Sequence, residues 1–143
     1  AMLARARERG IDAVRGVAES LPFRDEAFDT AVIVTTICFV DDVPRTLAEA
    51  RRVLRPCGSL VVGYVDADSP VGRVYREKQS ENPFYREAVF VSTDDLVDAL
   101  EAAGFSEFEF VQTIFRWPDE IDEREPVEEG YGGGSFVGIR ATR

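Results

Sequence analysis

The side chains best placed for chemistry follow two predicted strands. Ala18 and Glu19 come directly after a short strand predicted over 12–17, and Thr35 and Thr36 end a second, β-branched one. In α/β sheets, ligands bind beyond the carboxyl ends of the strands. A carboxylate and two hydroxyls at such positions therefore favour a small-molecule site. A solvated loop is the other interpretation of the first pair, and β propensity alone explains the two threonines equally well.

Aromatic side chains form a second group of candidates. Four of them lie within a charged, insertion-like stretch, 66–90, that comes directly after another predicted strand, and the fifth precedes it. Loops at strand ends are where α/β proteins place lids and substrate contacts. The residues that would wall a substrate site are Phe39, Tyr75, Phe84, Tyr85 and Phe90. Packing against helices explains the later four equally well, and an aromatic at the first position is also typical of a core.

Composition excludes several classes of function. The chain has 143 residues, a net charge of −10 and no histidine. The negative charge would repel a nucleic acid backbone, so we expect no nucleic acid partner. Without histidine, a Ser-His-Asp triad and a His-ligated metal site are excluded, and no metal site is expected. Two cysteines in a chain of this size imply no disulfide framework, and Cys38 is interpreted as a small buried apolar residue rather than a nucleophile.

Length and hydropathy indicate a single domain over 1–143, with a lid-like insertion at about 66–91. The longest apolar run, 31–40, is too short to span a bilayer, and no signal peptide opens the chain. We therefore expect no membrane partner and a cytoplasmic location. The glycine-rich 130–134 and the acidic 119–129 are interpreted as loops.

Strands alternate with helices along the chain. Helices are predicted from Met2 to Arg9, from Asp41–Asp42 to Pro56, and from the capping box at Ser92 to Gly104. Strands are predicted over 12–17, 30–36, 60–65, 107–114 and 135–141. This order predicts an α/β layer fold with a sheet of five strands, all parallel except the last.

Three motifs occur in a characteristic order. They are Gly16 to Phe23 with its Leu-Pro-Phe ending, then Phe28-Asp29 before an apolar strand, then Leu54-Arg55-Pro56-Cys57-Gly58 before the next strand. The chain resembles class I methyltransferases that depend on S-adenosylmethionine (SAM), in the branch that includes ubiquinone and menaquinone biosynthesis. The resemblance implies a Rossmann-like sheet with an antiparallel last strand, SAM as cofactor and a small-molecule methyl acceptor.

The resemblance also assigns the candidate residues. Those implied to contact the cofactor are Val17, Ala18, Glu19, Thr35 and Thr36, and those implied to contact the substrate are Phe39, Tyr75, Tyr85 and Phe90. Family members often carry an Asp at position 17 that accepts a hydrogen bond from adenine, which Val cannot do. Either Glu19 takes that role, or the backbone at Ala18 holds adenine. The general base, if one is needed, is not identified.

The glycine-rich turn that holds the cofactor's amino-acid end in this family is absent from the 143 residues. The first predicted helix also begins without a capping residue. We therefore expect the C-terminal portion of a truncated methyltransferase, whose sheet lacks N-terminal strands and whose chain alone binds SAM weakly. The alternative is a catalytically silent module that binds a partner or itself; a piece of a nicotinamide dehydrogenase is a weaker interpretation.

Missing strands would leave sheet edges unpaired. The edge at 30–36 is apolar and carries no Lys or Pro, which invites pairing with another chain. We expect either that 12–17 pairs directly with 30–34, or that two chains form a homodimer through this edge.

Overall fold

The computed structural model describes residues 2–143, which form one mixed five-stranded sheet with helices. The strands are β1 (Phe28–Val34), β2 (Leu54–Val65), β3 (Ser106–Thr113), β4 (Glu128–Glu129) and β5 (Phe136–Thr142). The helices are α1 (Met2–Glu8), α2 (Val43–Val53), α3 (Pro70–Glu77) and α4 (Thr93–Ala102), with short 3-10 turns η1 (Ile37–Phe39), η2 (Gln79–Glu81) and η3 (Pro118–Glu120).

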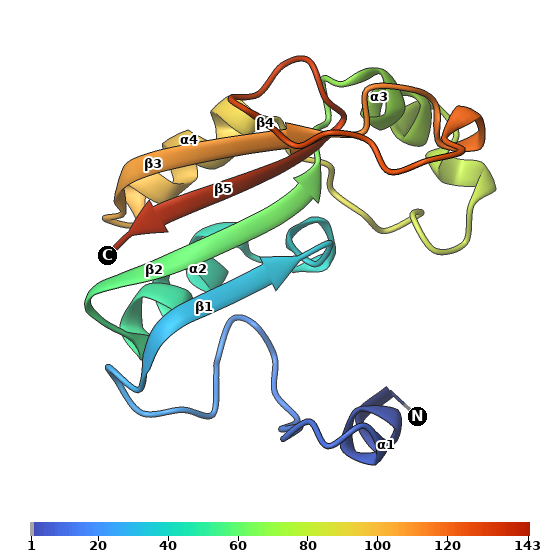
Figure 1. The fold of residues 1–143 in the computed structure, drawn as a ribbon. Coiled ribbons are helices and arrows are strands. Elements are labelled where there is room, and N and C mark those ends of the chain that lie inside the picture. Colours follow the sequence, from blue (N-terminus) through green and yellow to red (C-terminus); the bar gives the residue numbers. More distant parts are fainter. Residues whose placement is uncertain (1) are drawn as a thin grey trace.

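The strand order is β1-β2-β5-β3-β4. β1 and β2 are parallel, whereas β5 is antiparallel to both of its neighbours, β2 and β3. The predicted α/β class and the antiparallel last strand are thus confirmed. In Figure 1, α2 and α4 lie side by side on one face of the sheet, and α3 lies beyond the carboxyl ends of β1 and β2.

The core lies between the sheet and these two helices. Leu47 on α2 and Leu100 on α4 are fully buried, and both belong to one apolar cluster with Leu60, Val62 and Ile139 of the sheet. The helical spacing of apolar residues in the sequence predicts this face of each helix. Burying side chains of this size stabilises the fold by about 1.5–3 kcal/mol each, so the helices are held chiefly by this face.

The helix ends agree with the sequence signals. Asp42 caps α2, its carboxylate accepting a hydrogen bond from the Arg45 amide at 2.9 Å. Ser92 caps α4 in the same way, through the Asp95 amide at 3.1 Å. Gly104, with φ +88°, follows the end of α4 in the left-handed conformation that favours glycine.

The prediction of a strand over 12–17 is wrong, and so is its predicted pairing with 30–34. This segment has no regular structure beyond a single bridge between Val17 and Ser20. Among the described residues β1 pairs only with β2, and the segment before it runs along the open side without joining the sheet (Figure 1). A β-rich sequence needs a neighbouring strand within hydrogen-bonding distance, and local propensity does not supply one. The fifth strand is instead β4, inside the acidic stretch 119–129 that was predicted to be a loop. Because β4 is antiparallel to β3, the prediction that only the last strand departs from a parallel sheet is also wrong.

The Leu-Pro-Phe motif is fastened to α2 by an ion pair. Glu49 accepts a hydrogen bond from the Leu21 amide at 2.7 Å and pairs with Arg52. Arg52 in turn donates to the carbonyls of Leu21 and Phe23 and to the Asp25 carboxylate. The hydrogen bond from Arg52, with a further contribution from the Leu21 amide, lowers the pKa of Glu49 from 4.5 to about 2. The motif is therefore held to the helix by charge-assisted hydrogen bonds.

β2 begins with an irregular segment around Cys57. Phe28 and Thr30 of β1 are two residues apart, but their pairing partners on β2, Leu54 and Ser59, are five residues apart. Cys57 sits within this bulge at φ +63°, a left-handed conformation that disfavours any residue with a Cβ. A Cβ at Gly58 would lie 2.8 Å from the Arg55 carbonyl oxygen. The bulge therefore requires glycine at 58 and tolerates Cys57 only with strain.

Cys57→Gly should therefore stabilise the protein. Glycine removes the left-handed strain and loses part of that gain to the greater freedom of the unfolded chain, leaving roughly 0.5–1 kcal/mol. Urea unfolding measures the change. Cys57→Ser is the matched control, since it keeps the Cβ and should leave stability near that of the wild type. An equal gain in both variants would contradict strain at this position.

The interactions of the Glu49 carboxylate with the Leu21 amide and with Arg52, named here the Glu49 clamp, predict that the free energy of unfolding depends on pH. Because the folded pKa of Glu49 is lowered, its contribution is present above the unfolded value and is lost as the pH falls toward 2. Wild-type stability should fall more steeply than that of Glu49→Gln between about pH 5 and pH 3. Urea unfolding across this range measures both slopes. Glu101→Gln, at an exposed position on α4, is the control and should follow the wild type; parallel slopes for wild type and Glu49→Gln would contradict the clamp.

Candidate functional site

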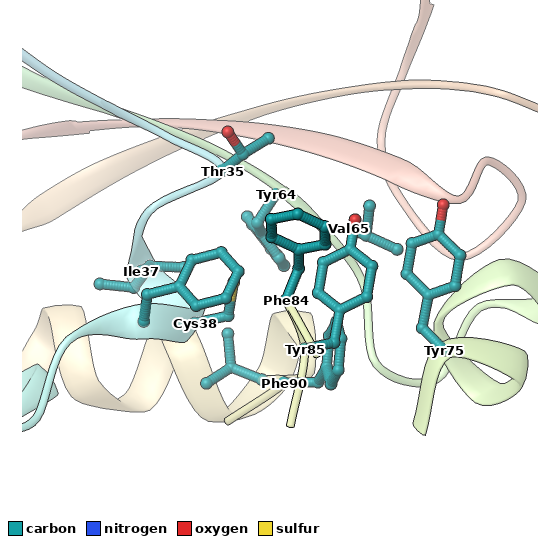
Figure 2. Close-up of a pocket in the computed structure, with 11 residues that line it drawn as sticks. Thr35, Ile37, Cys38, Tyr64, Val65, Tyr75, Phe84, Tyr85 and Phe90 are labelled. Carbon is teal, nitrogen blue, oxygen red and sulfur yellow. The ribbon is translucent and has the colours of Figure 1, made fainter. Parts of the chain in front are cut away.

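A cavity of about 390 Å³ lies beyond the carboxyl ends of β1 and β2. Figure 2 shows its lining, which comes from the turn after β1, the end of β2, α3 and the segment that precedes α4. The lining residues are Thr35, Ile37, Cys38, Phe39, Tyr64, Val65, Tyr75, Phe84, Tyr85, Phe90 and Val91. The fold thus brings together the four residues that the family resemblance assigns to the substrate, the further aromatic candidate Phe84, and one predicted cofactor residue, Thr35.

Thr35 occupies an unusual backbone conformation where β1 ends. Its φ is +49°, which is uncommon for any residue with a Cβ and an outlier for a β-branched one. Its amide still donates to the Gly63 carbonyl of β2 at 2.8 Å, so the residue is anchored to the sheet while the chain turns away from it. Strain of this kind persists where surrounding structure enforces it and clusters at functional sites.

Aromatic rings build one side of the cavity. Tyr85 stacks on Phe39 with ring centroids 6.2 Å apart and on Tyr75 at 5.2 Å, the ring planes differing by 16° and 19°. Phe90 tilts by 52° against both tyrosines. Such pairs contribute about 0.5–1.5 kcal/mol each beyond their buried area. Phe84, 84% exposed, also lines the cavity and leaves an aromatic surface open to solvent.

The lining carries no formally charged residue. Burial raises the pKa of the Cys38 thiol. Burial, and then the neighbouring Tyr75 and Cys38, raise the pKa of Tyr85. At neutral pH the cavity is therefore lined by apolar atoms, neutral hydroxyls and a protonated thiol, so none of its side chains is suited to act as a general base.

A buried hydrogen-bond chain fixes the far end of Tyr64. Its hydroxyl donates to Thr93 Oγ1 at 2.7 Å, and that hydroxyl donates to Asp66 Oδ2 at 2.5 Å. All three residues are buried, and burial raises the pKa of Tyr64 above its ordinary value. The chain links the end of β2 to the first turn of α4, which holds the walls of the cavity in register.

The predicted cofactor residues are not gathered in one place. Ala18 and Thr36 line a separate cavity of about 230 Å³ beside β1 and α2, and Val17 is 60% exposed and lines neither cavity. Glu19 accepts a hydrogen bond from the Asp41 amide at 2.8 Å. Hydrogen bonds from backbone amides, its own first and that of Asp41 next, lower the pKa of Glu19. The cofactor role of these residues stays a prediction.

Sequence reasoning left Ile37, Tyr64, Val65 and Val91 out of the site. Two of these, Tyr64 and Val65, end β2, and their place at a strand end beside the predicted lid was a usable signal. Ile37 and Val91 have ordinary apolar types, and only the fold brings them to the cavity. Within residues 2–143 no three potential metal ligands cluster together. No helix there combines the length and hydropathy needed to cross a bilayer.

Comparison with known proteins identifies relatives along nearly the whole chain. Residues 1–62 match the family model described as a methyltransferase domain. A solved SAM-dependent methyltransferase of Thermotoga maritima, described as a "possible histamine N-methyltransferase", is 52% identical with a TM-score of 0.97. The alignment covers 99% of this chain and 68% of that one.

Two curated relatives extend this result. An uncharacterised protein of Methanocaldococcus jannaschii is 39% identical over 138 residues, covering 96% of this chain and 67% of the relative. A demethylmenaquinone methyltransferase of a Mycobacterium species is 30% identical over 127 residues, covering 89% of this chain and 52% of that protein. The chain therefore spans between about half and two thirds of the length of these proteins. Its fold, its motifs and these identities together show that it belongs to the class I SAM-dependent methyltransferases.

Proposed function

We propose that this chain provides the acceptor pocket of a methyltransferase that transfers the methyl group of SAM to a small molecule. One observation carries the proposal: an aromatic-walled cavity of about 390 Å³ adjoins the strained Thr35 at the carboxyl ends of two parallel strands. This size lies within the range of small-molecule sites. The names of two similar proteins, which mention histamine and demethylmenaquinone, support a small acceptor.

The residues present fit the methyl end of SAM. When bound, SAM supplies an electrophilic methyl group on a sulfonium cation. Phe39, on the turn after β1, offers an aromatic face that attracts cations, and Thr35 adds a hydroxyl at the strand end. The sequence contains no glycine-rich turn that opens a helix, so the chain offers no comparable cradle for the amino-acid end of the cofactor.

The chain's contribution to catalysis is positioning. The stacked rings fix the orientation of an acceptor, and the apolar lining keeps water from competing for the methyl group. Because the methyl group arrives already activated, holding the acceptor atom in line with it supplies much of the rate. Tyr85 is the central ring of this arrangement, in contact with Phe39, Tyr75 and Phe90.

Tyr85→Ala should therefore lower methyl transfer by at least about tenfold while leaving SAM affinity unchanged, because it removes the acceptor platform only. Because the chain is expected to bind SAM weakly, transfer is measured at millimolar SAM, as S-adenosylhomocysteine formed with a pool of small-molecule acceptors, and SAM affinity is measured by calorimetry over the same concentrations. Tyr131→Phe, which alters a tyrosine outside the cavity, is the control. Wild-type transfer by Tyr85→Ala would contradict the assignment of the cavity as the acceptor site.

The 143-residue chain by itself should bind SAM more weakly than micromolar. Each missing hydrogen bond to a charged group costs about 1.5–3 kcal/mol, and two or more such losses lower affinity by several decades. Calorimetry with the chain, beside a family member that carries the glycine-rich turn, measures the difference. Micromolar binding by the chain would show that other residues here replace the turn.

A second candidate function, self-association by a catalytically silent module, is favoured by the outer edge of β1. Val32 is 62% exposed and Val34 50% exposed, and in the described structure nothing pairs with this side of the strand. An apolar unprotected edge invites a second copy. Sedimentation over a range of concentrations should detect a dimer that Val34→Lys abolishes. A wild-type monomer at high concentration would exclude this candidate.

A further inference from the structure

We infer that the acceptor is a neutral, flat nitrogen heterocycle of one or two rings, which attacks through a ring-nitrogen lone pair and is oriented by the hydroxyls of Tyr75 and Tyr85. The inference rests on the proposed function, because it names the substrate class of the same cavity. Three properties of the lining lead to it: the absence of charge, the parallel stacking of rings, and the pair of tyrosine hydroxyls.

Charge decides against an ionic acceptor. Asp, Glu, Lys and Arg make up 31% of the chain, yet none of the eleven described lining residues is one of them. An ammonium or carboxylate entering the cavity would lose its hydration without gaining a counter-ion, and for an ammonium this cost exceeds the attraction of an aromatic face. The net charge of −10 lies elsewhere on the molecule. The lining therefore selects a neutral molecule.

The arrangement of the aromatic rings favours a flat acceptor. The rings of Phe39, Tyr85 and Tyr75 lie within 20° of parallel from one pair to the next, and a planar ring system extends such a stack with little reorganisation. A cavity of about 150 Å³ holds one benzene ring. The volume of about 390 Å³ found here accommodates two rings.

The hydroxyls of Tyr75 and Tyr85 are available to hydrogen-bond the acceptor. Within residues 2–143, Tyr64 donates to Thr93 and Tyr131 to Asp94, whereas the hydroxyls of Tyr75 and Tyr85 have no protein partner. These two hydroxyls point the same way in Figure 2. Hydrogen bonds from tyrosines at an apolar wall orient a heteroatom on the edge of a flat ligand.

The lack of a base selects the reacting atom. A phenol or thiol has to lose a proton to become a good nucleophile, and no side chain of the lining is suited to accept it at neutral pH. A neutral ring nitrogen already holds its lone pair. It forms the nitrogen–carbon bond while the carbon–sulfur bond breaks, and that bond's electron pair stays on sulfur. The positive charge passes from sulfur to nitrogen, where the aromatic faces stabilise it, and no proton has to leave.

Three bicyclic probes of similar size test the acceptor class. Isoquinoline is neutral at pH 7 with an available lone pair, 1-naphthol is neutral but must lose a proton to react, and tryptamine carries an ammonium. Calorimetry without SAM should show isoquinoline and 1-naphthol binding at least tenfold more tightly than tryptamine. Equal or tighter binding of tryptamine would overturn the inference. This measurement needs no methyl transfer, so it is independent of the proposed function.

The transfer measurement separates the two proposals. With SAM, isoquinoline should be methylated at a rate that does not change between about pH 7 and pH 8.5, whereas any reaction of 1-naphthol should rise about tenfold per pH unit, as expected when hydroxide is the only base. Faster, pH-independent methylation of 1-naphthol would overturn the inference and leave the methyltransferase function standing. If SAM occupies the protein in calorimetry and no probe is methylated, the proposed function fails, and the binding comparison alone decides the inference.

Variants test the two hydroxyls. Tyr75→Phe and Tyr85→Phe keep the stack but remove one hydrogen bond each, and should weaken isoquinoline binding roughly two- to tenfold. Tyr131→Phe removes a hydroxyl bonded to Asp94 outside the cavity and should leave binding unchanged. Unchanged affinity in both cavity variants would refute the orienting role of the tyrosines.

Discussion

The arrangement of the cavity depends on the pairing of β2 with strands on both sides. β1 runs parallel to it, and β5 enters antiparallel between β2 and β3. This leaves Leu60, Val62 and Tyr64 fully covered on the helix face. Because β2 has no freedom to shift register without exposing that face, the positions of its last residues are fixed, and the cavity is built around them.

Two sets of hydrogen bonds fix the chain just beyond the ends of these strands. The hydrogen-bond chain from Tyr64 through Thr93 to Asp66 couples the end of β2 to the start of α4. The amide of Thr35 keeps the end of β1 attached to β2 while its positive φ redirects the chain. The cavity floor is thus anchored to the sheet, whereas the aromatic wall from α3 onward is held by ring packing and by hydrogen bonds such as those from the Gln79 side chain to the Ala88 carbonyl and from the Val89 amide to the Cys38 carbonyl.

The sequence predicted those parts of the structure that local patterns specify. Helical spacing and capping residues such as Asp42 and Ser92 located two helices, and strand-end positions located Thr35 and the aromatic wall. The prediction of a strand over 12–17 was wrong because strand pairing depends on residues distant in sequence. The β propensity of a segment does not indicate whether a partner strand lies beside it. Glu19 illustrates a different limit: its type and position suit ligand binding, but its carboxylate bonds the Asp41 amide, a partner 22 residues away in sequence that no local pattern reveals.

The exposure of Phe84 has a thermodynamic consequence. With 84% of its surface in water, this side chain keeps an apolar hydration shell at the edge of the cavity. An occupant that covers the ring releases this water, and burial of apolar surface lowers the heat capacity of the complex below that of its separate parts. The binding enthalpy of such an occupant should thus become more favourable as temperature rises. A single calorimetric enthalpy at one temperature therefore does not describe the strength of the ring contacts.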